Sequence, residues 1–583
     1  MPTDSLPFPA DAMSLDSQSF AAADGADGAT GQSYLNADTR AGTTVDGKES
    51  FTIDRAGLQL TGFDPVTMAP APGWGGIAGR PFTVTYGFRA SAPVDMPSDT
   101  AGFQRFNSQQ IHQAEQALQA WADVANIRFV RSGIGVEGEG AYSNDAAILF
   151  GNYSSGESGS AAFANFPGST LSTSGAGDVW INITSGSNSL PNMGNYGGQV
   201  LVHEIGHTIG LRHPGDYNAG DDGSAAITYA GSAEYYEDSR QYSVMSYFSE
   251  SETGANYGGR YAATPQLDDI RAAQIEYGAN IGTRTGDTTY GFNSNAGRDW
   301  FAATSSSSRL IFAVWDAGGR DTFDFSGYSQ NQKIELREGF FSNVGGLTGN
   351  VAVAQGAQIE NAVGGSGSDT ITGNALANSL SGGAGFDSIF AGAGNDTIDG
   401  GSGTSYLRGE DGNDSIVGGS VFDDLQGNMG NDTERGGAGD DYVVGGKDAD
   451  VLFGDDGDDL VYGNIGADTA DGGAGNDIVR GGQDNDSIAG GAGDDFMSGD
   501  KGSDTVAGGA GADIFHISSG AGTDRVLDFN LAEGDRVHLD PGTIYTLAQV
   551  GSDTVITLAG SSDQMVLVGV QVNTLTPGWI FGA

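Results

Sequence analysis

Cysteine is absent from the 583 residues of this chain, and lysine and arginine together number only 25. Without cysteine the protein has neither disulfides nor thiolate metal sites. If it works outside a cell, its fold must be stabilised by a different kind of crosslink. The 75 acidic residues leave a net charge of −50, which argues against nucleic acid and anionic membrane surfaces as partners and favours cations. Bound calcium would meet both conditions.

Long apolar runs are also missing. No stretch of 18 or more residues is apolar throughout, so we expect no stable membrane insertion. No lysine or arginine precedes Arg40, and the N-terminal residues therefore lack the features of a Sec signal peptide. Residues 1–35 are acidic, rich in Ala, Gly and Ser, and aperiodic, which predicts a propeptide or disordered leader.

Histidine occurs only six times, yet three of the six lie in the segment HEIGHTIGLRH at 203–213. On a helix, His203 and His207 stand one turn apart on the same face, and Glu204 lies beside them. Gly210 can end the helix in a left-handed conformation, which returns His213 toward the same ion. Three nitrogen ligands with an open fourth position predict one catalytic zinc ion.

A period of nine residues runs without a gap from 364 to 516, following GGxGxDxUx seventeen times, where U is apolar. Fixed register indicates a repeat architecture and not a flexible linker. Glycine turns with carbonyl and Asp oxygens provide hard ligands, so we predict a parallel β-roll with several structural calcium ions between its coils. The predicted calcium-binding aspartates are Asp369, Asp387, Asp396, Asp414, Asp423, Asp432, Asp441, Asp450, Asp459, Asp468, Asp477, Asp486, Asp495, Asp504 and Asp513.

Several residues depart from this repeat, and Asn378 and Ser405 replace its aspartate. Glu434 and Ala470 replace the apolar residue at the eighth position, in two even-numbered repeats, and should therefore lie on the same side of the roll. Asp448 and Asp484 replace the fourth-position glycine, again in even-numbered repeats. We expect the side of the roll that carries Glu434 and Ala470 to pack less well there.

Both patterns together resemble the serralysin family, metzincin-clan zinc proteases that carry RTX calcium repeats. The resemblance rests on HEIGHTIGLRHPGDYNAG from His203 and on YSVMSYFSE at 242–250, and it extends over roughly residues 40–540. It implies that His203, His207 and His213 bind zinc and that Glu204 is the catalytic base. It also makes Met245 the Met-turn residue beneath the metal. Tyr247 becomes a zinc ligand of the resting enzyme that moves to stabilise the oxyanion.

The resemblance implies further features outside the zinc segment. Additional calcium ligands would be the carbonyl of Arg284 together with Asp287, Asp316, Gly318, Asp321 and Glu360. The family is secreted from Gram-negative bacteria through type I secretion machinery, by an uncleaved C-terminal signal. The ending TPGWIFGA lacks the acidic residue followed by hydrophobics that is usual there. We expect an extracellular monomer that acts on protein and peptide substrates.

We therefore predict an α+β metzincin catalytic domain, with a twisted mixed sheet and long helices, followed by an all-β C-terminal part. The predicted divisions are the leader 1–35, the catalytic domain 36–280, a β-sandwich leading into the roll at 281–363, the roll at 364–516, and closing strands with the secretion signal at 517–583.

Local patterns place the main elements of the catalytic domain. Alternation predicts strands at 81–88, 146–153 and 178–183, and strand-bearing sequence at 48–62. Apolar residues at helical spacing predict a helix capped by Ser108 that buries Ile111, Ala114, Leu118 and Trp121. The zinc helix should start near Gln199, and a last helix should run from Pro265 to Tyr277 and stop at Gly278. Residues 160–166 are our candidate for an edge strand that binds extended peptides.

The function predicted from these features is a secreted zinc endopeptidase stabilised by calcium. The alternative is a catalytically silent, calcium-dependent RTX adhesin or surface-layer protein, in which the zinc segment would be a relic.

Overall fold

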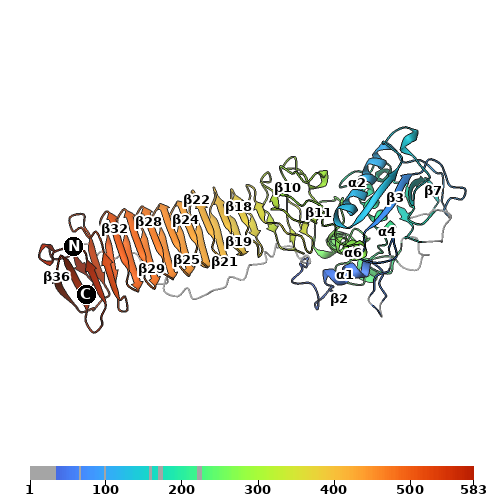
Figure 1. Cartoon of the computed structure of the whole chain (residues 1–583). Coiled ribbons are helices and arrows are strands. Elements are labelled where there is room, and N and C mark those ends of the chain that lie inside the picture. The colour runs from blue at the N-terminus through green and yellow to red at the C-terminus, as the bar shows by residue number, and fades with distance from the viewer. Residues whose placement is uncertain are drawn as a thin grey trace.

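A computed structural model of the chain describes residues 34–582, except 65–66, 68, 72, 98–99, 157–160, 169–174 and 219–225. Figure 1 shows an α/β part at one end and a long stack of short strands that leads away from it. Nearly all of the predicted leader lies outside the described residues. Among the described helices, none combines the length and the apolar character needed to cross a membrane.

The α/β part is built on a five-stranded mixed sheet. Its strands in order are β5 (Ile127–Ser132), β3 (Phe82–Phe88), β6 (Ile148–Tyr153), β9 (Val179–Asn182) and β8 (Ala162–Ala164). All neighbours pair in parallel except the edge strand β8, which is antiparallel to β9. The strands predicted at 81–88, 146–153 and 178–183 are thus confirmed as β3, β6 and β9.

Three long helices accompany this sheet: α2 (Ser108–Val124), α4 (Tyr196–Thr208) and α6 (Leu267–Tyr277). The predicted apolar stripe of α2 is confirmed, because Ile111, Ala114, Leu118 and Trp121 are all buried. Its N-cap is not Ser108 but the preceding residue, Asn107, which forms a capping box with Gln110. Helix α4 starts three residues before the predicted Gln199, because Asn195 accepts a hydrogen bond from the Gly198 N–H.

The prediction of strand-bearing sequence at 48–62 was wrong for most of that segment, which forms helix α1 (Ile53–Leu60). Thr52 caps the helix by accepting from the Arg55 N–H, and Ile53, Ala56 and Leu60 form a buried face at helical spacing. Short elements complete the part of the chain before the roll: β1 (Thr44–Val45), β2 (Lys48–Glu49), β4 (Thr100–Ala101), β7 (Ser155–Gly156), α3 (Gly186–Ser189) and α5 (Tyr229–Ser232), with 3-10 turns at 139–141 and 250–253.

The remainder of the chain forms two stacked, mainly parallel sheets (Figure 1). The fifteen-stranded sheet contains, in order, β10 (Thr289–Gly291), β12 (Thr322–Asp324), β16 (Asn361–Val363), β18 (Ser379–Gly383), β20 (Thr397–Gly401), β22 (Ser415–Gly419), β24 (Thr433–Ala438), β26 (Val451–Asp456), β28 (Thr469–Ala474), β30 (Ser487–Ala492), β32 (Thr505–Ala510), β34 (Thr523–Val526), β38 (Gln564–Leu567), β37 (Asp553–Leu558) and β36 (Tyr545–Val550). The twelve-stranded sheet contains β13 (Lys333–Glu335), β17 (Thr370–Thr372), β19 (Asp387–Ala393), β21 (Ser405–Asp411), β23 (Asp424–Met429), β25 (Tyr442–Lys447), β27 (Leu460–Ile465), β29 (Ile478–Gln483), β31 (Phe496–Lys501), β33 (Ile514–Ile517), β35 (Arg536–Leu539) and β39 (Ile580–Phe581).

Each strand of the array pairs with the strand 18 residues later, so two nonapeptides make one coil of the predicted roll. Ile398 lies opposite Ile416, for example, and Leu407 lies opposite Leu425. The sixth and eighth positions of the repeat point inward and are buried. Glu434 on β24 and Ala470 on β28 do lie in the same sheet, as predicted.

The sheets do not begin at residue 364. Strands β10, β12 and β16 already belong to the fifteen-stranded sheet, and β13 already pairs in parallel with β17. Four strands of the segment 281–363 therefore belong to the same sheets as the repeats, and the predicted β-sandwich there stays a prediction. A small sheet of β11 (Phe312–Val314), β15 (Val351–Val353) and β14 (Phe341–Ser342) lies beside them in the chain, with a 3-10 turn at 299–301.

Candidate active site

Helix α4 brings His203 and His207 onto one face, and the turn after it brings in His213. Gly210 has a φ of 104°, and the Leu211 N–H bonds back to the Gly206 carbonyl, which closes the helix where the sequence predicted. The Nε2 atoms of His207 and His213 are 3.1 Å apart, and those of His213 and His203 are 3.3 Å apart. The three predicted ligands therefore converge on one point.

The other ring nitrogen of each histidine faces a backbone carbonyl. The Nδ1 atom lies 2.8 Å from the Val244 oxygen in His203, 2.7 Å from Leu211 in His207 and 2.8 Å from Tyr217 in His213. A carbonyl only accepts, so each Nδ1 carries the proton and each Nε2 presents a lone pair. Burial lowers the pKa of His203 to about 3 and that of His213 to about 4, which keeps both neutral.

Three lone pairs at such short separations repel one another unless a cation lies between them. Zn–N bonds of 2.0–2.1 Å in a tetrahedral site would place neighbouring nitrogens about 3.3 Å apart, close to the separations seen here. The side chains of His203, His207 and His213 form the one cluster of potential metal ligands of this size found among the described residues. The donor set and spacing therefore suit zinc.

Glu204 follows the first histidine and is buried, with 5% of its surface exposed. Its Oε2 atom has no hydrogen-bond partner among the residues that the structure describes. Burial raises the pKa of this carboxyl group to about 8. A carboxyl group with a proton affinity near neutrality is suited to accept and return a proton.

Met245 and Tyr247 approach the histidines from a loop that precedes α6. Met245 is fully buried against α4, with its sulfur 2.4 Å from the place where a Cβ atom on Gly206 would stand. The ring of Tyr247 has its centre 4.5 Å from that of His213 and 5.8 Å from that of His203. Both residues are thus placed beside the three histidines.

The structure adds residues that sequence reasoning missed. Asp269 accepts from the Ser243 hydroxyl at 2.6 Å and from the Val244 N–H at 2.7 Å, and the Val244 carbonyl accepts from His203. Asp238 likewise accepts from the Tyr217 hydroxyl at 2.7 Å, and the Tyr217 carbonyl accepts from His213. Two buried aspartates thus hold the carbonyls that orient the histidines. For Asp269 the available signal was an acidic pair in the first turn of a predicted helix.

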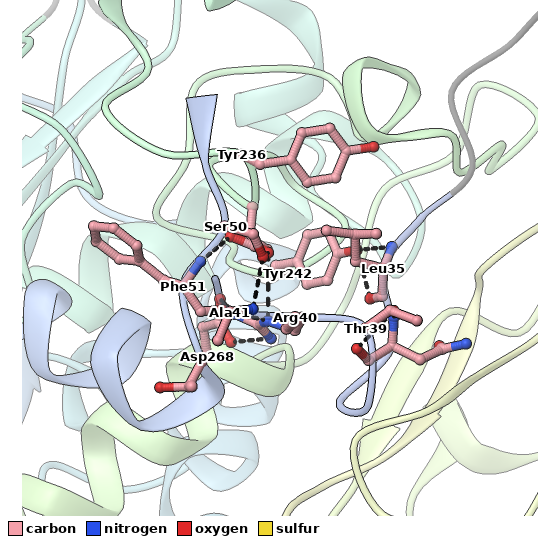
Figure 2. A network of polar contacts seen from close by, with 12 residues as sticks. Leu35, Thr39, Arg40, Ala41, Ser50, Phe51, Tyr236, Tyr242 and Asp268 are labelled. Carbon is pink, nitrogen blue, oxygen red and sulfur yellow. Dashed lines mark hydrogen bonds and ion pairs between the residues drawn. The ribbon is translucent and has the colours of Figure 1, made fainter. Parts of the chain in front are cut away.

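The neighbouring residue Asp268 anchors the N-terminal segment (Figure 2). Its two carboxylate oxygens each accept from the guanidinium group of Arg40 at 2.9 Å, and Arg40 also donates to the Phe51 carbonyl at 2.8 Å. The hydroxyl of Tyr242 bonds to both the N–H and the carbonyl of Leu35 at 2.8 Å. The N-terminal segment, α6 and the loop that holds Met245 therefore form one connected network.

A second set of unusual carboxylates lies in the roll. The Oδ1 atom of an array aspartate typically accepts the backbone N–H of the residue 18 positions earlier, as Asp432 does from Asp414 at 2.8 Å. Fourteen of the fifteen predicted calcium-binding aspartates, all except Asp369, have a buried Oδ2 atom with no partner among the described residues. Burial raises the pKa of Asp450 and Asp486 to about 8. Rows of uncompensated oxygens are a favourable environment for a hard cation.

The calcium ligands predicted before the roll lie on two loops that touch. A Cβ atom on Gly319 would stand 2.6 Å from the Gly286 carbonyl oxygen. Asp321 accepts from the Thr288 N–H at 2.7 Å, its Oδ2 atom has no partner among the described residues, and its own N–H donates to Glu360 at 2.7 Å. Burial, with the nearby Asp316 and Glu360 carboxylates, raises the pKa of Asp321 to about 7.

Other members of this predicted set have protein partners. Asp287 accepts from the Arg320 N–H at 2.9 Å, and Asp316 accepts from the Gly318 N–H at 3.0 Å. Arg284 has a positive φ of 48° and donates its guanidinium protons to Asp123 at 3.0 Å. The structure therefore brings Asp316, Asp321 and Glu360 together and places Arg284 and Asp287 on the adjoining loop.

Comparison with known proteins agrees with the geometry. The family described as Peptidase M10 serralysin C terminal matches residues 279–544. Metallopeptidase AprA of Pseudomonas marginalis is 50% identical over 339 residues, which cover 58% of this chain and 68% of that protein. Metalloprotease AprA of Pseudomonas entomophila (strain L48) is 48% identical over 59% of this chain and 69% of its own. Serralysin A of Dickeya chrysanthemi is 49% identical, with coverages of 57% and 66%. At this identity and coverage, the chain belongs to the serralysin family of metalloendopeptidases.

Proposed function

We propose that this chain is a secreted zinc endopeptidase that hydrolyses peptide bonds in proteins, and that calcium stabilises its roll. The observation that carries the catalytic part is the convergence of three neutral histidines beside a buried carboxyl group, with the Nε2 atom of His213 3.1 Å from that of His207 and 3.3 Å from that of His203. His203, His207 and His213 would hold the zinc, and Tyr247 would join them in the resting enzyme. When bound, zinc supplies Lewis acidity and lowers the pKa of water.

The residues of the chain provide the proton transfers. Glu204 takes a proton from the attacking water on Oε2, and it then gives this proton to the departing amine nitrogen. The Tyr247 hydroxyl donates a hydrogen bond to the oxygen of the carbonyl under attack, where negative charge develops. Met245 does not bind metal but supports α4 from below through its contact with Gly206.

Strand β8 is our proposal for the substrate-binding edge. It ends the five-stranded sheet, and the described part of the predicted segment 160–166 continues from it to Phe166. The Phe166 ring centre lies 5.4 Å from that of His207, so this edge leads to the histidines. An extended peptide that pairs with the free edge would therefore pass over the site.

The calcium part of the proposal rests on the unpartnered Oδ2 atoms of the array. Extracellular calcium modules bind at about 10⁻⁴–10⁻³ M, so the roll would stay unfolded in a bacterial cytosol and fold outside. Export by type I secretion machinery, with the signal in residues 517–583, follows from the same reasoning and from the family. The proposal also includes the predicted boundaries of the catalytic domain, 36–280, and of the roll, 364–516.

Glu204→Gln tests the catalytic proposal. We expect casein cleavage to fall by about 10²–10⁴, because the amide cannot accept the proton. Zinc content and circular dichroism should stay at wild-type values. Glu139→Gln is a matched control, since that side chain is 84% exposed and pairs with Arg105 on the surface.

Wild-type cleavage by Glu204→Gln protein would contradict the proposal. Phenanthroline should abolish cleavage by the wild type, and added zinc should restore it. A wild-type chain that binds calcium but cleaves no protein with zinc present would instead favour the adhesin or surface-layer alternative.

A further inference from the structure

Glu434 is a carboxylate in a column of apolar side chains. It lies on β24 with no exposed surface, at the eighth position of its repeat. Its neighbours in the sheet are Ile416 on β22 and Leu452 on β26, which pair with it directly in register. The column Ile398, Ile416, Glu434, Leu452 thus has one ionisable member.

The apolar core of the molecule divides at this residue. One continuous core runs from the α/β part into the roll and ends with Ile416 and Leu425. A second core starts at Val443 and Leu452 and continues to the closing strands. Glu434 occupies the repeat between them, so side chains on either side of it do not make a continuous apolar contact.

Both carboxylate oxygens of Glu434 are buried, and neither accepts a well-formed hydrogen bond within the described residues, with the Gly427 N–H as a weak donor close by. Arg408 is a cation close enough to influence this carboxylate, but its guanidinium group is engaged elsewhere. It donates to the Leu407 carbonyl at 2.8 Å and to the Asp424 carbonyl at 3.0 Å, and it pairs with the Asp424 carboxylate at 3.0 Å. A buried carboxyl group without partners is costly, so its retention calls for a partner that the protein chain does not provide.

The array aspartate Asp432 lies beside Glu434. The point where a Cβ atom on Gly427 would stand is 2.1 Å from Asp432 Oδ2 and 2.6 Å from Glu434 Oε1, so these two oxygens share one small region. Asp450, one coil further, accepts from the Asp432 N–H through Oδ1 at 2.9 Å. The Oδ2 atoms of both aspartates are buried and unpartnered within the described part of the chain. Glu434 and Asp432 thus present oxygens to one small region where the core is broken, and Asp450 is hydrogen-bonded to the backbone of Asp432.

We infer that Glu434 supplies an extra carboxylate ligand to the calcium ion held at Asp432, which makes this coil the tightest calcium site of the roll. The inference rests on the proposed binding of calcium by the array. Calcium affinity rises with the number of charged ligands, and a carboxylate from inside the roll adds one where other repeats carry an apolar side chain. The ion replaces the apolar contact that Glu434 interrupts, and it joins the two halves of the core.

Two substitutions in the full-length chain test the inference. Glu434→Gln keeps the shape and removes the charge, whereas Glu434→Leu restores the apolar column. Ala470→Val is the control, because Ala470 is the other irregular eighth position and lies in the same sheet without a carboxylate. Calcium chloride is titrated into chelator-treated protein by calorimetry, and thermal unfolding is followed by circular dichroism in calcium and in EGTA.

We expect wild type and Ala470→Val to bind one calcium ion about 10-fold or more tightly than the others. Both Glu434 variants should lose this tight ion. In calcium, Glu434→Gln should melt below wild type, because its buried amide lacks both the tight ion and an apolar side chain in its place.

Equal calcium stoichiometry and affinities in wild type and Glu434→Gln would overturn the inference and leave Glu434 as a buried neutral acid, with the calcium roll intact. A wild-type chain that binds no calcium in the array would overturn the proposed function of the roll as well.

Discussion

Gly206 stands between the two histidines of α4, and its lack of a side chain lets Met245 pack against the helix. The HExxH spacing predicts which faces the ligands occupy, because the helical repeat is a local property of the backbone. It does not predict that the residue between them must be glycine. That requirement arises because Met245 and Trp121 both approach the position, the second at 3.2 Å.

Gly206→Ala should lower zinc affinity about 10-fold, although alanine favours helix formation by about 1 kcal/mol over glycine. The new methyl group displaces Met245, and with it Val244, whose carbonyl orients His203. Competition with a zinc-binding dye measures the affinity. Gly206→Ala combined with Met245→Ala should recover part of it, and a single variant with unchanged affinity would show that Met245 moves aside without effect.

At the scale of elements, the site depends on how α6 meets the loop that carries Met245 and Tyr247. Asp268 and Asp269 sit side by side in the first turn of α6 but face different partners, the first Arg40 and the second Val244. The glycine at 278 predicts where α6 ends, and the structure confirms that end. The local sequence of α6 does not predict which distant loop each of the two aspartates contacts.

Asp269→Asn should weaken zinc binding about 10- to 100-fold, since the orienting network behind a ligand is typically worth this much. The Oδ2 atom accepts from two N–H groups, those of Val244 and Gln266, and an amide nitrogen at that place would face two donors. Asp268→Asn is the matched control. It breaks the buried pair with Arg40 and costs about 3 kcal/mol of stability without changing zinc affinity. Equal zinc affinities for both variants would contradict this role of Asp269.

The turns of the roll also require particular backbone conformations. Gly437 has a φ of 107°, and a Cβ atom there would stand 2.2 Å from the carbonyl oxygen of Gly419, one coil earlier. Gly560 has a φ of 91° but open space around it. Asp448 and Asp484, which replace the fourth-position glycine of their repeats, take φ values of 77° and 78°, a region that Asp tolerates better than most residues.

Gly437→Ala should lower the melting temperature in calcium more than Gly560→Ala does. Both substitutions cost about 1–3 kcal/mol of backbone strain, but only the first also pushes two coils apart. Differential scanning calorimetry of the two variants measures the difference. Equal shifts would mean that the coil spacing adapts to a methyl group.

At the scale of the whole molecule, the net charge of −50 and the stacked rows of aspartates must be compensated for the roll to persist. The apolar core of the roll is narrow, because each nonapeptide typically contributes one inward apolar side chain and one buried aspartate. The proposed calcium ions between the coils would cancel the repulsion and satisfy the unpartnered oxygens in the same step.

Calcium removal should therefore unfold the array. At 10 mM calcium, about 10–100 times the expected dissociation constants, each bound ion contributes about 1.4–2.7 kcal/mol. We expect EGTA to remove the β-strand signal in circular dichroism and to lower the melting temperature sharply. Magnesium at the same concentration should not replace calcium, because it sheds its water reluctantly. Identical spectra and melting curves in calcium and EGTA would contradict the proposal.

The error at residues 48–62 has a specific cause. The segment contains apolar residues that fit either period, and helix α1 is decided by the Thr52 cap and by a face that packs on α6. The nine-residue period likewise does not predict that β13 pairs with β17, because β13 lies before the first repeat.

The amino-acid sequence by itself determined which three histidines converge, the nine-residue period and the inward row of aspartates. These are periodic patterns, and the pitch of a helix or the pleat of a strand converts them into geometry locally. Tertiary structure alone decided that Asp269 and Asp238 hold the carbonyls behind His203 and His213, that Gly206 leaves room for Met245, and that Arg40 reaches Asp268 across 228 residues. It also set the break in the core at Glu434. Such contacts join segments far apart in the chain, and they exist only once packing has brought those segments together.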